Sequence, residues 1–435
     1  MLTVSRNKKI VMFYSKKCRQ SRLGKKVKTH SSPKNCVTKV RNKFGVEVHN
    51  SSNSSMLSEY LLLFGLLRLM GIKVVEHAHS EIGNNFEEHK ITSVKQRVLD
   101  CSENCLKYFT SGIVYSRTLI AILRVIFLKN TTVSLIRLFQ SVLFTLFYLV
   151  AYRKRQTMLQ IAKDTECVYQ RLPKCIRKYK KYSFKGVLAF VMVLLAIRMV
   201  LYRSIPKNNE KFQKQMYEFF LATDTHHAYS YYFILLIAIL ELVSYIEGCV
   251  VLSIFTVYYS VTCSFIQDVF KYLLNQVDGG DSSIESKKLH CIYESIMKTL
   301  NDMDSGFSFL ALNTVLICTG GLFWDGYSIA FYKNATGGFL IFTLNSIFYL
   351  VLQLMLMISA SFSNELANKA KINMQCLPYE TAENQQKMNF FKKTLMQENG
   401  LTLWKIYVMD RSLVVGIFGT LLTYGILLGT LEKNN

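Results

Sequence analysis

Seven stretches of this chain are dominated by apolar side chains, and each is long enough for a helix to cross a bilayer, which takes about 20 residues. Half of the 435 residues are hydrophobic and only four are proline, so long helices can run unbroken. We therefore predict an all-α integral membrane protein with seven transmembrane helices. The expected spans are 106–128, 132–152, 186–203, 228–262, 306–332, 338–361 and 406–430.

The first expected span and an apolar run before it both contain charged residues. The first expected span contains Arg117 and Arg124, and an earlier run, 57–75 (LSEYLLLFGLLRLMGIKVV), contains three charged residues. Charged groups are costly inside a bilayer but suit a helix at its interface. We interpret the earlier run as an amphipathic helix that lies at the interface or packs under the bundle. An eighth span is the alternative there.

Positive charge is distributed unevenly between the segments that connect the spans. If the N-terminus is cytosolic, the inner segments hold 35 lysines and arginines and the outer segments hold 6. Because Lys and Arg are enriched on the cytoplasmic side, we predict an inverted topology, with a cytosolic N-terminus and an extracellular C-terminus. None of the 11 cysteines falls in an outer segment, so the sequence predicts no extracellular disulfide framework.

Several functional classes fit this pattern poorly. Seven spans with a cytosolic N-terminus reverse the topology of a G-protein-coupled receptor, which is the least favoured alternative. The basic residues behind the net charge of +24 flank the apolar runs, so no nucleic-acid partner is expected. The pairs His77/His79 and Cys101/Cys105 lack further ligands at metal spacing. We predict no catalytic residues, no metal, no cofactor and no enzymatic activity.

The last apolar run carries a sequence pattern near its end. Thr423 and Tyr424 precede five small or apolar residues, 425–429, which are followed by Thr430 and Leu431. This pattern resembles the signature of arthropod gustatory receptors, which are related to the insect odorant receptors: Thr-Tyr, five hydrophobic residues, then Gln-Phe. Thr430 stands in place of Gln and Leu431 in place of Phe.

Two further segments support the resemblance. Leu67–Ile72, before the first span, and Met409–Leu413, before the last, are also similar to the family. The resemblance implies a ligand-gated, non-selective cation channel in the plasma membrane of a sensory neuron. Its subunits would form a homotetramer or a heterotetramer with other gustatory receptor subunits, and a small-molecule tastant would open it.

The resemblance also assigns roles to residues of the last helix, which would line a central pore. Leu427 would form an apolar constriction, and rings of apolar side chains close pores by dewetting. Thr430 would replace the polar gate residue, with Tyr424 and Leu431 completing the signature. Packing against a neighbouring helix is the alternative role for Leu427.

Polar groups within the spans are candidates for ligand contact, because such groups are expensive in a membrane. We select Trp324, Asp325, Glu241 and Asn313. An indole face beside a carboxylate suits a sugar or an amine. The alternative for each is a hydrogen bond between helices. In a polytopic transporter, the alternative function, Glu241, Glu247 and Asp325 would instead carry ions or substrate.

The sequence and the resemblance together divide the chain into five parts. These are a basic flexible cytosolic tail (1–55), an amphipathic pre-membrane segment (56–105), the first four transmembrane helices with the ligand-pocket region (106–262), cytosolic anchor segments with transmembrane helices five and six (263–405), and the seventh, pore-lining helix (406–435).

Overall fold

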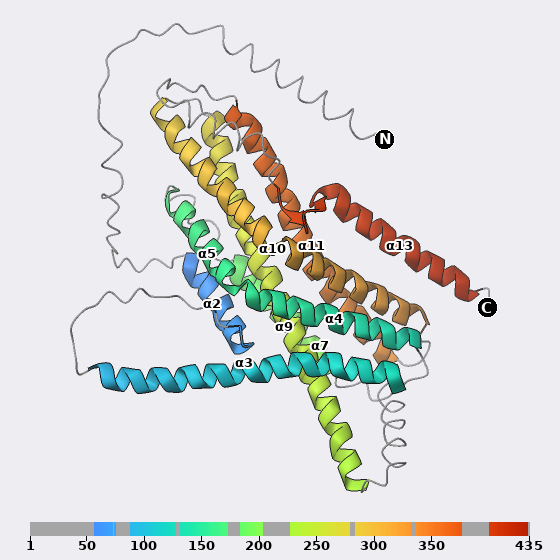
Figure 1. Ribbon diagram of the computed structural model, residues 1–435. Helices are drawn as coiled ribbons and strands as arrows, with labels where there is room; N and C mark the ends of the chain where they lie inside the picture. Colours follow the sequence, from blue (N-terminus) through green and yellow to red (C-terminus); the bar gives the residue numbers. More distant parts are fainter. Residues whose placement is uncertain are drawn as a thin grey trace, which may run out of the picture.

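The computed structural model is almost entirely helical (Figure 1). It describes residues 56–72, 74, 88–127, 131–172, 183–202, 227–278, 283–331, 336–375 and 400–433, so the basic segment 1–55 lies outside the described residues. The helices are α2 (Met56–Leu69), α3 (Glu88–Phe127), α4 (Thr131–Arg153), α5 (Arg155–Gln170), α7 (Ser183–Tyr202), α9 (His227–Asp278), α10 (Ser283–Phe331), α11 (Thr336–Gln375) and α13 (Arg411–Lys433).

Four of the helices are long and apolar enough to cross a membrane. Their candidate spans are Leu135–Arg153, Leu235–Val277, Lys288–Ile329 and Phe339–Gln375. Shorter apolar helices at Gly186–Ile197 and Arg411–Thr423 coincide with two more of the expected spans. These helices support an all-α membrane protein. The count of seven spans and their orientation stay predictions.

Helices α9, α10 and α11 are much longer than a bilayer is thick, as is α3 with 40 residues. Helices α9, α10 and α11 contain 52, 49 and 40 residues. At about 1.5 Å per residue each measures roughly 60 to 80 Å, against about 30 Å of hydrocarbon core. The sequence predicted a connecting segment at 263–305, but α9 and α10 continue helically through it and only 279–282 lie between them.

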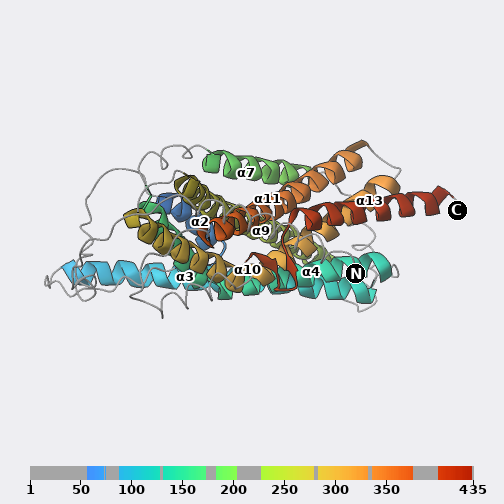
Figure 2. The ribbon, with the colours of Figure 1, turned by 90° about the horizontal axis from the view of Figure 1, so that it is seen from above.

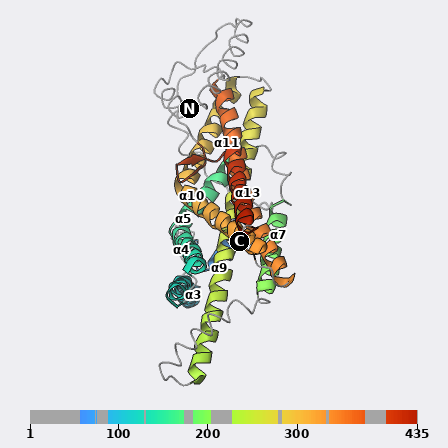
Figure 3. The ribbon, with the colours of Figure 1, turned by 90° about the vertical axis from the view of Figure 1, so that its right-hand side faces the viewer.

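These long helices pack against one another. The inner faces of α9, α10 and α11 meet in a layer of fully buried aromatic side chains, and Figures 1 and 3 show the three helices together at one end of the molecule. Phe307 of α10 lies edge-on to Phe255 and Tyr258 of α9, with ring centroids 6.0 and 5.8 Å apart. Edge-to-face pairs of this kind add to the free energy gained from burial.

Helix α4 is joined to α5 through a change of direction at Lys154. The Tyr258 hydroxyl of α9 donates a 2.8 Å hydrogen bond to the Met158 carbonyl in the first turns of α5. The residue before Met158, Thr157, approaches Gly306 of α10 so closely that a Cβ at Gly306 would lie 2.9 Å from the Thr157 methyl group. These contacts hold α5 against α9 and α10.

Helix α2 packs one face against α9 and α5. Tyr60, Leu63 and Leu67 are fully buried on that face, and the Tyr60 and Thr262 hydroxyls share a 3.1 Å hydrogen bond. The opposite face includes exposed Leu61, so α2 presents apolar side chains outward as well.

Helix α2 ends at Gly71 in a left-handed turn. The Ile72 amide donates to the Leu67 carbonyl, the Gly71 amide donates to the Arg68 carbonyl, and Gly71 has φ +74°. This is the Schellman pattern that glycine favours at helix ends. Leu67 and Ile72 are both buried, as that motif usually requires. The Leu67–Ile72 segment therefore terminates a helix and turns the chain.

We expect Gly71→Ala to destabilise the protein. A Cβ at Gly71 would lie 2.2 Å from the Thr110 hydroxyl, and the positive φ adds strain; together these effects should cost about 2 kcal/mol. The measurement is thermal unfolding of the purified protein in detergent. Gly65→Ala is the matched control, because nothing lies within 4 Å of its Cβ position in the middle of α2. Equal melting temperatures for the two variants would contradict this account.

Candidate functional site

The candidate pore helix, α13, begins five residues later than the sequence predicted. The expected span starts at 406, but α13 starts at Arg411. Asp410 caps its first turn: its carboxylate accepts a 2.8 Å hydrogen bond from the Leu413 amide and a 3.0 Å bond from the Ser412 hydroxyl. Side-chain oxygens at this position satisfy amides that the helix leaves unpaired. The helix therefore has a defined start, set by Asp410.

A short hairpin replaces the expected start of that span. Strands β1 (Thr402–Leu403) and β2 (Tyr407–Val408) pair antiparallel. Between them Trp404 and Lys405 both adopt left-handed backbone angles, φ 50° and 59°. Consecutive positive φ values are typical of the tightest hairpin turns, which usually contain Asn or Gly. For other residues the conformation costs about 1–2 kcal/mol each, so surrounding contacts must hold it.

Contacts with α10 hold one side of the hairpin. The Trp404 amide donates to the Ser308 carbonyl at 3.0 Å, and the indole lies edge-on to Phe309, with centroids 5.6 Å apart. The Asp304 carboxylate accepts hydrogen bonds from both the amide and the hydroxyl of Thr402, each 2.7 Å long. The strained turn is thus fixed to one helix of the bundle.

Asn364 of α11 holds the other side. Its side-chain amide donates to the carbonyls of Leu401 and Met409, both at 2.9 Å, and its oxygen accepts the Leu401 amide at 2.7 Å. One asparagine therefore closes the base of the hairpin. Arg411 of α13 pairs with Glu365, the next residue of α11. We call the group formed by Asp304, Thr402, Asn364, Leu401 and Met409 the hairpin clasp.

Beyond the clasp, α13 leaves the bundle. Figures 1 and 2 show it running along one side of the molecule to the C-terminus. Leu413, Val414 and Ile417 are partly buried against the bundle. The opposite face carries a stripe of small or polar residues that are all exposed, Ser412, Gly416, Gly419 and Thr423, flanked by exposed Val415 and Leu422. A Cβ at Gly416 or Gly419 would meet nothing within 4 Å.

The predicted pore residues lie in the last turns of α13. The backbone there is helical, and the side chains of Tyr424, Leu427, Thr430 and Leu431 lie outside the described part. Helical register places Leu427 and Thr430, four and seven residues after Thr423, on the same face as Thr423. Tyr424 and Leu431 share a different face.

The predicted ligand residues do not gather at one place. Asn313 and Asp325 are buried in α10, but twelve positions along one helix separate them by about 18 Å. Asn313 donates a 3.0 Å hydrogen bond to the Leu143 carbonyl of α4. This is a hydrogen bond between helices, the alternative to ligand contact. Trp324 is half-buried and stacks on Tyr327, with centroids 6.0 Å apart. The Glu241 side chain lies outside the described residues. Ligand contact by these residues stays a prediction.

Comparison with solved structures gives the fold. The insect olfactory receptor OR5 from Machilis hrabei in complex with eugenol superimposes with a TM-score of 0.62. The alignment covers 86% of this chain and 98% of the receptor, at 13% sequence identity. The chain has the fold of an insect olfactory receptor. A second structure of OR5 superimposes with a TM-score of 0.57 at 12% identity. No protein-family description and no curated protein matches the sequence.

Within this fold the clasp ties the base of α13 to α10 and α11. The sequence analysis did not identify Asp304 or Asn364, since both lie in segments interpreted as inner connections. One sequence signal for the strand was present. Leu401 and Leu403 are apolar and Thr402 between them is polar, and this alternation with a period of two is typical of a strand.

Glu247 of α9 is an unusual group within this fold. It is 4% exposed, and neither carboxylate oxygen has a hydrogen-bond partner among the described residues. Arg117 of α3 lies near the same part of α9, where it donates a 3.4 Å hydrogen bond to the Ser244 carbonyl. Its guanidinium also lies over the Phe144 ring of α4, with Cζ 4.3 Å from the ring centroid. A buried carboxylate of this kind is expensive in a membrane, so Glu247 is a candidate for a functional role.

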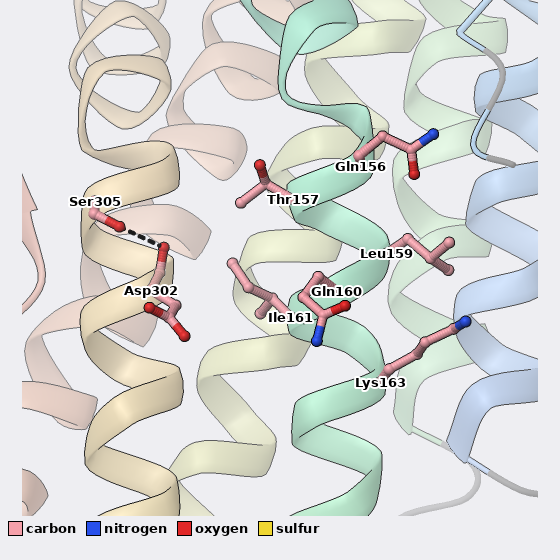
Figure 4. A pocket seen from close by; sticks show the side chains of 8 residues that line it. All are labelled: Gln156, Thr157, Leu159, Gln160, Ile161, Lys163, Asp302 and Ser305. Carbon is pink, nitrogen blue, oxygen red and sulfur yellow. Dashed lines mark hydrogen bonds between the residues drawn. The ribbon is translucent and has the colours of Figure 1, made fainter. Parts of the chain in front are cut away.

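A polar groove of about 580 Å³ lies between α5 and α10 (Figure 4). Gln156, Gln160 and Lys163 come from α5, and Asp302 and Ser305 from α10. In Figure 4 the Asp302 carboxylate points from α10 toward the α5 side of the groove. In the described part of the chain no three His, Cys, Asp or Glu side chains converge as metal ligands would.

Proposed function

We propose that this chain is a subunit of a ligand-gated, non-selective cation channel of the gustatory-receptor type. A small-molecule tastant would open it at the plasma membrane. One observation carries the proposal: within the fold of an insect olfactory receptor, α13 turns a stripe of small and polar residues, flanked by Val415 and Leu422, away from its own bundle.

The exposed face of α13 suits a tetramer around a pore. Small residues let membrane helices approach one another closely, and hydroxyl groups tolerate contact with water. Gly416 and Gly419 supply the first property, and Ser412 and Thr423 the second. Four copies related by an axis parallel to α13 would enclose a narrow path lined by this face. Homomeric and heteromeric tetramers both fit.

In this proposal the hairpin clasp couples ligand binding to movement of the pore helix. The Leu401–Met409 segment is fixed to α10 by Asp304 and to α11 by Asn364, and α13 follows directly. A ligand that shifts the outer parts of α10 and α11 would therefore move the base of α13. The inner parts of α9, α10 and α11, with their buried core, would form a cytosolic anchor for this movement.

The ligand is a small organic molecule in this account. One structure of OR5 from Machilis hrabei is in complex with eugenol. For this chain we retain Trp324, Asp325, Glu241 and Asn313 as candidate contacts, and we add Glu247 because its buried carboxylate has no described partner. An acceptor of that kind favours ligands that carry hydroxyl or amino groups.

Whole-cell recording tests the proposal. We expect cells that display the full-length chain to give an inward cation current with at least one of eugenol, sugars and amines. The current should persist when G-protein signalling is blocked. Sugars or amines as the effective class would support a gustatory receptor, and volatile phenols alone would point to an olfactory one. If the response disappears when G-protein signalling is blocked, the proposal that the chain forms a channel is wrong.

A further inference from the structure

The turn of the hairpin exposes a run of large side chains, residues 404–408, which we call the hairpin tip. Trp404, Ile406 and Tyr407 are 54%, 60% and 62% exposed, although Leu403 and Met409 on either side of the run are buried. The fold of the turn does not favour this composition, because consecutive positive φ values are adopted most easily by Asn and Gly. The large side chains of the hairpin tip therefore need another explanation.

The hairpin lies at a boundary between polar and apolar parts of α10. Asp304 accepts the hydrogen bonds that hold the hairpin, and the next charged residue of α10 is Asp325. The uncharged stretch between them measures about 30 Å, which is the thickness of the hydrocarbon core of a bilayer. The carbonyl that binds the Trp404 amide, that of Ser308, lies only one turn after Asp304. The hairpin is therefore level with one edge of the membrane-spanning part of α10.

Two other helices have the same boundary at the hairpin. Within α11 no charged residue precedes Glu365, which follows Asn364 of the hairpin clasp. In α13, Arg411 pairs with Glu365, and the next charged residue is Glu432, again about 30 Å along the helix. Asp304, Glu365 and Arg411 thus mark the ends of three uncharged stretches and all lie beside the hairpin. The three helices together place the hairpin at one surface of the membrane.

The side chains of the hairpin tip suit a membrane surface. Trp and Tyr are enriched where the bilayer meets water, because their rings fit among the lipid headgroups, and a lysine can extend its ammonium group to the headgroup level. Membrane helices that contact one another use small residues instead, such as Gly416 and Gly419 on α13. The hairpin tip, Trp-Lys-Ile-Tyr-Val, contains no small residue. Its composition favours lipid over a second copy of the chain.

We propose that the hairpin tip inserts into the headgroup layer of the bilayer and anchors the base of α13 there. Trp404 and Tyr407 would lie among phospholipid headgroups, Ile406 would contact the first carbons of the acyl chains, and Lys405 would face lipid phosphate. This contact would fix the height of the hairpin, and so of the start of α13, relative to the membrane surface. The inference goes beyond the proposed function and does not depend on channel activity.

Tryptophan fluorescence tests the anchor, because the chain contains only two tryptophans. Trp324→Phe leaves Trp404 as the single reporter and keeps a ring beside Tyr327. The purified full-length variant is reconstituted into phosphatidylcholine vesicles in which part of the lipid carries a nitroxide quencher, either on the headgroup or deep on the acyl chain. We expect the headgroup label to remove most of the Trp404 emission and the deep label to remove little of it.

Three results would overturn the proposal. Quenching by iodide in the water but by neither lipid label would place the hairpin tip in water. Emission that no quencher changes would assign the tip to a contact with a second copy of the chain. Stronger quenching by the deep label would place it in the hydrocarbon core. Trp324→Tyr provides a second single-tryptophan protein if Trp324→Phe does not elute as the same oligomer as wild type.

The matched control places a tryptophan outside the proposed membrane level. Glu294 is exposed on α10, ten positions before Asp304 and so about 15 Å from it along the helix. Glu294→Trp is made in the chain that carries both Trp324→Phe and Trp404→Phe. Neither lipid label should quench this tryptophan. Quenching by the headgroup label as strong as that of Trp404 would contradict the placement of the boundary at Asp304.

Discussion

Leu427→Ser is expected to give a cation current without ligand. In the proposed pore, Leu427 lies on the same face of α13 as Thr423 and forms an apolar ring that excludes water. Serine would let water and ions remain in the constriction. Each 1.36 kcal/mol removed from a barrier raises a rate tenfold, so the basal current should rise by about tenfold or more. Whole-cell recording without ligand measures this current.

Leu428→Ser provides the matched control. Helical register turns residue 428 toward the face that carries Leu413, Val414 and Ile417, which packs on the bundle. The same substitution there should leave the basal current unchanged. Surface labelling of both variants normalises the currents. Equal basal currents in Leu427→Ser, Leu428→Ser and wild type would contradict the assignment of Leu427 as the constriction.

Asn364→Ala is expected to release the hairpin. The substitution removes three hydrogen bonds, each contributing about 1 kcal/mol, from a half-buried position. Hydrogen exchange at the Leu401 and Met409 amides should therefore accelerate by about 100-fold. Mass spectrometry of the purified protein measures this exchange. Since α13 follows the hairpin directly, ligand-evoked current should also be lost while the protein still reaches the surface.

Two comparisons separate this loss of coupling from a general loss of structure. Asn301→Ala removes a half-buried asparagine of α10 for which no hydrogen bond is described, and it should change neither exchange nor current. The double variant Asn364→Ala/Leu427→Ser should still conduct, because its pore needs no signal from the bundle. Unchanged exchange at Leu401 in Asn364→Ala would show that the clasp does not hold the hairpin.

The membrane helices were predictable because hydropathy marks them directly. The run 132–152 lies within α4 and 338–361 within α11. The prediction stopped at 262 in α9, although the helix continues to Asp278. Beyond 262 the buried residues Ile266, Phe270 and Leu273 recur at helical spacing among polar ones. That pattern is typical of an amphipathic helix outside the bilayer, and a count of apolar residues does not detect it.

The turn of the hairpin was not predictable from its own residues. Trp404-Lys405 carries none of the Asn or Gly that normally indicates such a turn. Its conformation depends on Asp304, about 100 positions earlier, and on Asn364 in another helix. Local patterns contain no information about contacts of that range. For the same reason the sequence selected Asn313 as a ligand contact without revealing its bond to Leu143.

The most direct measurement is single-channel recording of the purified chain in a planar bilayer of phospholipid alone. No G protein or other subunit is present there. The account predicts discrete conductance steps from Leu427→Ser without ligand, with a reversal potential that follows the cation gradient and not the chloride gradient. Steps that follow chloride would contradict the claim that α13 lines a cation pore, and so would a silent bilayer containing Leu427→Ser that is folded and tetrameric.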